Sequence, residues 1–224
     1  MFQFDTVIYH ALMPRTPRSG PGSTAPGTTA RTRRAILDAA ISVYARDRTA
    51  SLSEVARAAG VGRSTLHRYF PDRSALVREL ARDAVEATRQ AFEEAALDQG
   101  APAEAFPRAV QAVFRVSDRM AFLFGEGQGG EWDEAGFERA FEEAHAPVAD
   151  LLSRGLAEGV LDPEYDPEWF VRALWYMASA GWESVTEGSM PRHRAVEHVT
   201  RTLTRGLFRP PSPEGEGRGV HPGI

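Results

Sequence analysis

Apolar residues recur at every third or fourth position along most of the chain, which is the spacing of helices that bury one face. Ile36, Ala40 and Tyr44, for example, share one side of a helix over about residues 32–47. The same spacing predicts further helices over about residues 52–59, 63–69, 72–98, 103–118, 131–158 (bent or broken near Pro147), 167–187 and 192–208. No pattern typical of a strand is present. Together with a short aromatic turn at residues 120–124, these segments predict an all-α fold of about nine helices.

Segments rich in proline, glycine, serine and threonine bound the helical region and cannot bury a core. Residues 1–30 are expected to form a disordered arm, and residues 209–224 a disordered tail. The apolar start of the arm, residues 2–12, is either a short helix or lies before a true translation start at Met13. Residues 125–130 are rich in glycine, and we interpret them as a flexible loop that either gates a site or merely connects two helices.

Two of the short helices, joined across Gly60, have the residue types of a helix-turn-helix. Ser51 and Glu54 predict a capping box, in which each side chain bonds the backbone N–H of the other residue. Ala56 is small where the two helices cross. The apolar wedge beneath them consists of Val55, Val61 and Leu66. This arrangement lays a second helix in the major groove of DNA. The alternative is a helical hairpin with a solvated basic face.

The composition favours a soluble intracellular protein, and a cytoplasmic location is expected. The chain has 224 residues, of which 42% are apolar, enough for a sizeable core. It has no cysteine, which excludes disulfides, thiolate metal sites and a cysteine nucleophile. No apolar run approaches the roughly 18 residues that a membrane span needs, so no membrane partner is expected.

The net charge of −5 conceals an uneven distribution. Residues 1–78 hold 12 arginines against 5 acidic residues, whereas residues 79–224 hold 14 arginines against 26. The first part therefore carries +7 and the second part −12. A basic head on an acidic body is typical of a protein that presents one end to a polyanion.

The basic and hydroxyl side chains around the turn are the candidate DNA contacts. Those on the second short helix can bind base edges or phosphates, and the sequence leaves both open. The arginines at the end of the arm are placed either to enter a minor groove or to solubilise the tail. Arg73 stands where a helix begins and suits a phosphate. The candidate set is Arg31, Arg33, Arg34, Ser51, Arg63, Ser64, Thr65, His67, Arg68, Tyr69 and Arg73.

Residues 34–76 resemble the DNA-binding domain of the TetR family of bacterial transcriptional regulators. The resemblance rests on Ile36-Leu37-Asp38-Ala39-Ala40, Glu54-Val55-Ala56, Ala58-Ala59-Gly60-Val61, Thr65-Leu66, Tyr69-Phe70-Pro71 and Ser74-Ala75-Leu76. It implies a ligand-responsive regulator, more often a repressor than an activator, that binds a roughly palindromic double-stranded operator as a homodimer. The chain departs from the family pattern in three places: His67 replaces a phosphate-contacting tyrosine, Arg73 replaces a lysine, and the link at residues 47–50 is short and lacks a glycine.

After a DNA-binding domain at residues 31–78, residues 79–208 are expected to bind a ligand and to dimerise. The helix at residues 167–187 is apolar on two sides, and such a helix must be covered on both. The resemblance implies a four-helix dimer bundle built from the last two helices of each chain. The alternative is that both apolar stripes belong to the chain's own core. The expected interface residues are Phe170, Leu174, Met177, Gly181, Val196, Val199 and Leu203.

Aromatic residues on the helices of the body suit an internal apolar pocket for an unidentified small-molecule effector, expected to be apolar or amphipathic, although any one of them is better explained by packing. Polar residues beside them are candidate anchors, and Arg119 and Gln128 also belong to that group. The expected pocket residues are Phe106, Phe114, Arg115, Asp118, Phe122, Phe141, His145, Trp175 and Trp182.

Other classes of function find less support. Glu142 and His145 form one Glu-x-x-His motif, but a di-metal bundle needs two, and the pair Glu197 and His198 has the wrong spacing. No glycine-rich phosphate loop and no serine elbow is present. We therefore expect a protein that is not an enzyme and has no cofactor or metal. The alternatives are a helical protein–protein adaptor and, less favoured, a helical-bundle metalloprotein.

Overall fold

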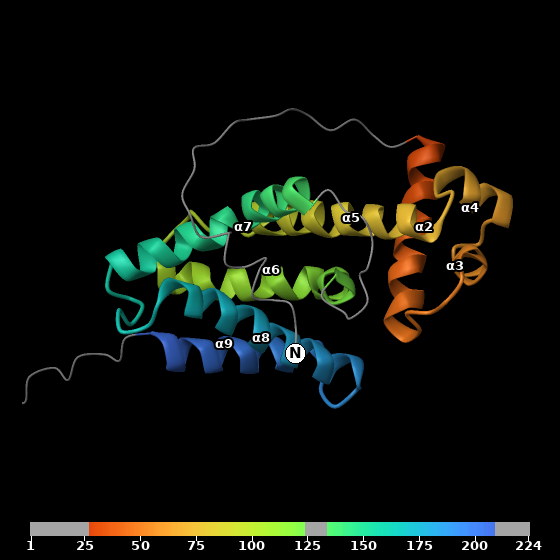
Figure 1. Cartoon of the computed structure of the whole chain (residues 1–224). Coiled ribbons are helices and arrows are strands. Elements are labelled where there is room, and N and C mark those ends of the chain that lie inside the picture. The colour runs from red at the N-terminus through yellow and green to blue at the C-terminus, as the bar shows by residue number, and fades with distance from the viewer. Residues whose placement is uncertain (1–26, 124–133, 209–224) are drawn as a thin grey trace, which may run out of the picture.

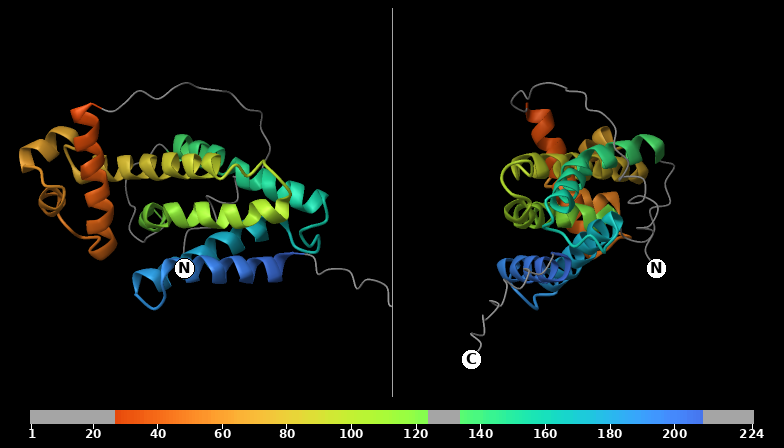
Figure 2. Two further views of the ribbon diagram at one scale, coloured as in Figure 1. Left: turned by 180° about the vertical axis from the view of Figure 1, so that it is seen from behind. Right: turned by 90° about the vertical axis from the view of Figure 1, so that its left-hand side faces the viewer.

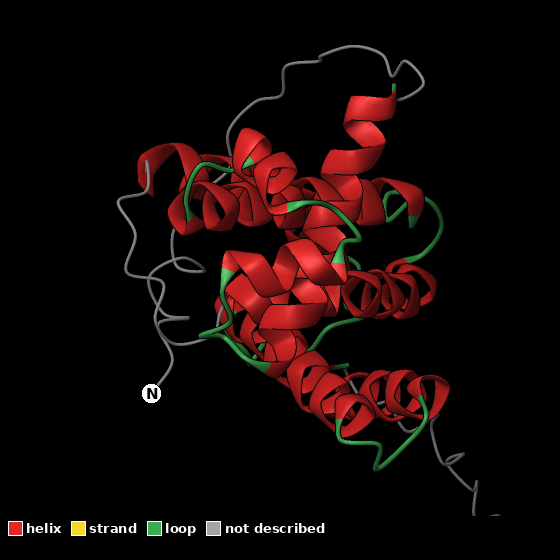
Figure 3. Cartoon of the chain, turned by 90° about the vertical axis from the view of Figure 1, so that its right-hand side faces the viewer, coloured by secondary structure: helices red, strands yellow, loops and turns green. Residues whose placement is uncertain are grey.

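The computed structural model describes residues 27–123 and 134–208. The expected arm up to residue 26, the glycine-rich loop at 125–130, the tail at 209–224 and the alternative start at Met13 lie outside the described residues. Within them, every regular element is a helix, in agreement with the predicted all-α fold, and one isolated bridge joins Leu161 to Phe208 (Figure 3). The helices are α2 (Thr28–Arg46), α3 (Leu52–Ala58), α4 (Arg63–Tyr69), α5 (Arg73–Glu94), α6 (Pro102–Leu123), α7 (Glu134–Ala157), α8 (Pro167–Thr186) and α9 (Arg192–Leu207).

Helices α2, α3 and α4 form a head at one end of the molecule (Figure 1). The predicted capping box at Ser51 and Glu54 is present. The turn after α3 is a Schellman motif, in which Val61 N–H donates to the Ala56 carbonyl and Gly60 N–H to that of Arg57. Gly60 has a φ of +67°, a conformation that other residues adopt only with strain.

Helix α5 joins the head to the body. Asp72 caps it by accepting a hydrogen bond from Ala75 N–H. Leu76 and Leu80 belong to the small core of the head, whereas Ala84 and the residues after it belong to the large core of the body. The expected domain boundary at residue 78 therefore falls inside a continuous helix, which couples the two parts mechanically.

The body packs α6 against α5, α7, α8 and α9. Helices α8 and α9 lie side by side along one side of it (Figure 2). Among residues 27–123 and 134–208, no helix combines the length and the apolar character that crossing a membrane requires.

Two predicted element boundaries are wrong. The first helix begins at Thr28, inside the expected arm. The helix at 103–118 and the aromatic turn at 120–124 are one helix as far as Leu123, because Val116 and Met120 continue its buried face. Helix α7 is not broken at Pro147, one of the two predicted alternatives, and Val148 and Leu151 beyond the proline are buried in the body core.

Candidate functional site

Helix α4 presents one polar face to solvent. Leu66 is fully buried and fixes the orientation of the helix against the head. The side chains predicted to contact DNA lie on the other side: Arg63, Ser64, His67 and Arg68 are exposed, and Thr65 and Tyr69 are half-buried. The guanidinium of Arg68 lies over the Tyr69 ring, 5.6 Å from its centroid. The predicted contacts of this helix are therefore gathered on one accessible surface, which we call the reading face.

His67 already uses one ring nitrogen within the head. Its Nδ1 lies 3.2 Å from the Pro71 carbonyl oxygen, which can only accept. The neutral ring that makes this bond carries its proton on Nδ1. In this tautomer Nε2 is an acceptor and does not donate to a phosphate.

Arg73 has a different role from the predicted phosphate contact. Its Nη1 donates to the Ala50 carbonyl at 2.9 Å, and its Nη2 donates to the Arg48 carbonyl. The guanidinium also lies over the Tyr44 ring, 4.6 Å from its centroid. Arg73 thus holds the short link between α2 and α3.

The link is further fixed from within. Asp47 Oδ1 accepts from the Thr49 N–H at 2.8 Å and from the Thr49 hydroxyl at 2.6 Å. These two bonds lower the pKa of Asp47 below its ordinary value. The side-chain turn explains how the link closes without the customary glycine.

Arg33 and Arg34 were predicted to lie at the end of a flexible arm, but they lie within α2. Arg33 pairs with Glu79 of α5 at 2.6 Å. Arg34 binds Asp38 and Asp83. Both arginines thus have acidic partners within the fold, and α2 begins before them, at Thr28. Arg31 is exposed on the same helix.

Four charged side chains from three helices meet where the head joins the body. This junction cluster consists of Arg34 and Asp38 of α2, Asp83 of α5 and Arg119 of α6. Arg119 Nε lies 3.0 Å from Asp83 Oδ2, and Arg119 Nη2 lies 3.2 Å from Asp38 Oδ1. Burial raises the pKa of Asp83, and the charge of Arg34 opposes that rise. Sequence reasoning missed this cluster because its members are far apart in the chain.

Part of the expected ligand pocket is brought together around His145. This ring stacks on Phe141 with a centroid distance of 4.0 Å, and Trp175 lies 5.2 Å away. Phe92, which was not predicted, approaches edge-on at 5.8 Å. Burial lowers the pKa of His145 to about 4, so the imidazole is neutral at pH 7.

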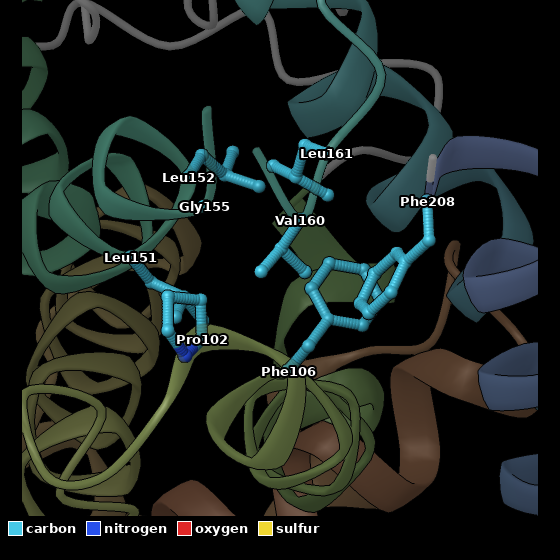
Figure 4. A pocket seen from close by; sticks show the side chains of 8 residues that line it. All are labelled: Pro102, Phe106, Leu151, Leu152, Gly155, Val160, Leu161 and Phe208. Carbon is cyan, nitrogen blue, oxygen red and sulfur yellow. The ribbon is translucent and has the colours of Figure 1, made fainter. Parts of the chain in front are cut away.

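The other expected pocket residues are dispersed. Phe106 packs against Phe208, and both line an apolar pocket between the first turns of α6, the last turns of α7 and the residue after α9 (Figure 4). The surrounding side chains fill that pocket and leave no room for a water molecule. Arg115 is exposed and donates to the Ala91 carbonyl at 2.6 Å.

The remaining expected residues lie on α6 and α8. Phe114 is buried beside Gly181. Trp182 and Asp118 are half-buried, and burial raises the pKa of Asp118. Phe122 lies in the last turn of α6, and Gln128 lies outside the described residues.

The predicted dimer interface is largely internal to the chain. The residues of that set on the two last helices pack against each other and against α6, which is the alternative that the sequence left open. A Cβ on Gly181 would lie 2.7 Å from Phe114 Cζ and 2.9 Å from Val199 Cγ2, so this glycine permits close packing inside one chain. Phe170, Leu174, Gly181, Val199 and Leu203 are buried, and Met177 and Val196 are half-buried against the same core.

The outer side of α8 is exposed instead. Trp169 is 52% exposed and Tyr176 44%. Ala173 and Ala180 lie on the same side of the helix by their spacing. In the described part of the chain, no three His, Asp or Glu side chains are grouped so that they could hold a metal ion.

Comparisons with known proteins agree with this geometry. Residues 36–80 match the model of the bacterial regulatory proteins of the tetR family. The helix-turn-helix transcriptional repressor LfrR of Mycolicibacterium smegmatis is 37% identical over 185 residues, which are 83% of this chain and 95% of that protein.

Solved structures show the same fold. The structure of LfrR from Mycobacterium smegmatis in complex with proflavine has a TM-score of 0.66 at 36% identity, covering 81% of this chain and 99% of that one. The ketosteroid transcriptional regulator KstR2 of Mycobacterium tuberculosis has a TM-score of 0.66 at 18% identity, covering 84% of this chain and 100% of that one.

Proposed function

We propose that this chain, which belongs to the TetR family of bacterial regulatory proteins, is a repressor that a small aromatic effector releases from its operator. Family membership makes it a transcriptional regulator that binds operator DNA, acts as a dimer and is not an enzyme. The observation that carries the proposal is the reading face of α4, where arginines and hydroxyls stand exposed above the fully buried Leu66. A cytoplasmic location is part of the proposal, because operator DNA lies there.

The exposed side of α8 is the proposed dimer surface. Trp169 and Tyr176 offer large rings, and Ala173 and Ala180 on the same side allow a partner helix to approach closely. Two copies related by a two-fold axis would present two reading faces to one side of a duplex. The operator would then be roughly palindromic, with half-sites about one helical turn apart.

The junction cluster is the proposed link between effector and DNA. Arg119 belongs to the body, Asp38 belongs to the head, and Asp83 lies between them on α5. An effector that shifts α5 relative to α6 would alter these pairs and tilt the head. It acts by binding more tightly to the state that cannot hold DNA.

The effector is proposed to be flat and aromatic. The related repressor LfrR has been solved in complex with proflavine, a flat aromatic dye. In this chain the aromatic group around His145, made of Phe92, Phe141 and Trp175, suits a molecule of that shape.

The test is DNA binding by the reading face. Fluorescence anisotropy with DNA from upstream of the protein's own gene should show tight, salt-dependent binding by the wild type. Arg68→Ala should weaken it by about tenfold or more, since a single base or phosphate contact contributes about 1–3 kcal/mol. The control is Arg89→Ala on the exposed side of α5, which removes an arginine that pairs with Glu86 and Glu93 of its own helix.

Two outcomes would contradict the proposal. Equal DNA binding by the wild type and Arg68→Ala would show that the reading face is not part of the DNA interface. An absence of binding to any DNA at low salt would favour the protein–protein adaptor. Sedimentation must show that Arg68→Ala is still a dimer.

A further inference from the structure

One buried nitrogen in the body lacks a hydrogen-bond partner. Three polar side chains of the described body are buried: Thr88, Ser117 and His145. The hydroxyls of Thr88 and Ser117 donate to carbonyls one turn earlier, at 2.8 and 2.9 Å. Nε2 of His145 has no such partner in the described structure and no exposed surface. Buried polar atoms in native proteins are nearly always paired, so this one indicates a missing partner.

The other ring nitrogen defines what that partner must be. Nδ1 lies 2.7 Å from the Phe141 carbonyl oxygen, which accepts but cannot donate. The neutral ring therefore carries its proton on Nδ1, and Nε2 keeps its lone pair. The ring stays neutral at pH 7 because burial lowers its pKa to about 4. The missing partner is a hydrogen-bond donor.

The surroundings define the shape of the donor. Phe141 lies nearly parallel to the imidazole, with an angle of 25° between the planes. Trp175 of α8 is tilted by 54°, and Phe92 of α5 stands edge-on at 70°. Helices α5 and α7 run beside each other above α6 (Figure 1), and α8 packs against α7. The three rings around the imidazole therefore come from α5, α7 and α8. Such rings bind flat aromatic molecules by stacking, and their faces attract positive charge.

We propose that Nε2 of His145 accepts a hydrogen bond from the effector, which is a flat aromatic molecule with an N–H or O–H group attached to its ring. The molecule lies between α5, α7 and α8, with its ring against Phe141 and Trp175. A neutral or cationic ring is accepted. This inference rests on the proposed function and adds the atom that selects the ligand.

Two dyes of the same shape and charge separate stacking from hydrogen bonding. Aminoacridine is a flat tricyclic cation with N–H donors, and N-methylacridinium is a similar cation without any. Each is titrated by fluorescence into the full-length, DNA-free protein, because acridines also intercalate into DNA. The variant is His145→Phe, which keeps a flat ring and removes the acceptor.

The wild type should bind aminoacridine more tightly than N-methylacridinium. His145→Phe should weaken the binding of aminoacridine about tenfold, which is the effect of losing about one hydrogen bond. The affinity for N-methylacridinium should stay within about twofold of the wild-type value. His145→Gln places an amide oxygen near the position of Nε2 and should keep the preference for aminoacridine. If circular dichroism shows that His145→Phe does not fold, His145→Gln and the two dyes on the wild type decide the question.

Three results would overturn the inference: no binding of either dye by the wild type, an equal loss of affinity for both dyes in His145→Phe, or no loss of affinity for aminoacridine in that variant. The operator assay on the same preparations separates this failure from that of the proposed function. A protein that binds upstream DNA but shows none of the expected discrimination refutes the role of His145 alone. A protein that binds no DNA refutes the repressor.

Discussion

Arg119 of α6 and Asp83 of α5 form an ion pair where the body meets the helix that joins it to the head. Their Nε and Oδ2 atoms lie 3.0 Å apart, and their side chains are only 18% and 14% exposed. Pairs on the open surface contribute little to stability, whereas a partly buried carboxylate that loses a partner is costly.

Arg119→Met should therefore lower the free energy of unfolding by about 1–2 kcal/mol, since Asp83 would keep only Arg34. Arg82→Met is the matched control, because that arginine is 73% exposed and its contact with Glu79 is long, at 3.4 Å. The control should change stability by less than about 0.5 kcal/mol. Urea unfolding measures both variants, and equal effects would contradict the role of the junction cluster.

The acid stability of the protein should depend on His145. The folded state takes up a proton on this ring only near pH 4, whereas an unfolded chain does so near pH 6.5. Between these values the unfolded state binds more protons, so stability falls as the pH drops. From pH 7 to pH 5 the loss from this residue should be about 2 kcal/mol.

His145→Phe should lack this part of the pH dependence. Urea unfolding of both proteins at the two pH values gives the difference. A wild type and a variant that lose the same stability between pH 7 and pH 5 would show that the ring is not buried as described.

Two glycines in the last helices should respond in opposite directions to alanine. A Cβ at Gly181 meets Phe114 and Val199 at under 3.0 Å, so Gly181→Ala should destabilise the protein by about 1–2 kcal/mol. Gly206 has no atom within 4 Å of the same position, so Gly206→Ala should stabilise it by up to about 1 kcal/mol. Thermal unfolding measures both, and a harmless Gly181→Ala would mean that α6, α8 and α9 pack less closely.

A charge on the exposed side of α8 should break the dimer. Tyr176→Glu places a carboxylate where we propose that a partner helix packs, and the dimer dissociation constant should rise at least about tenfold. Gln111→Glu adds the same charge at an exposed position of α6 and should leave the dimer intact. Analytical ultracentrifugation distinguishes the two. A stable Tyr176→Glu dimer would place the partner on another surface.

The reading head could be predicted because its signals are local. The capping box at Ser51 and Glu54 spans four residues, and the turn at Gly60 is fixed by hydrogen bonds within one helix end. Helix periodicity likewise predicted most of the body, because each helix buries one face.

The sequence could not predict which residues the charged side chains pair with, or what covers a helix that is apolar on two sides. Arg34 finds Asp83 at a separation of 49 residues, and nothing near Arg34 in the chain indicates that pairing. Helix α8 carries two apolar stripes, and periodicity cannot tell whether a partner covers one of them or whether both face the chain's own core, as they do here. Phe170 and Leu174 were assigned to a partner for that reason, whereas the exposed Trp169 and Tyr176 were overlooked.

The guanidinium of Arg73 is bound inside the head, where it donates hydrogen bonds to the backbone carbonyls of Arg48 and Ala50. A guanidinium held in this way displaces no counterion when DNA binds. The salt dependence of operator binding reports the number of phosphates neutralised, about 0.9 per contact in the logarithmic slope. The slope should therefore be shallower than the arginines of the head suggest, and Arg73→Met should lower affinity through a loosened link while leaving the slope unchanged.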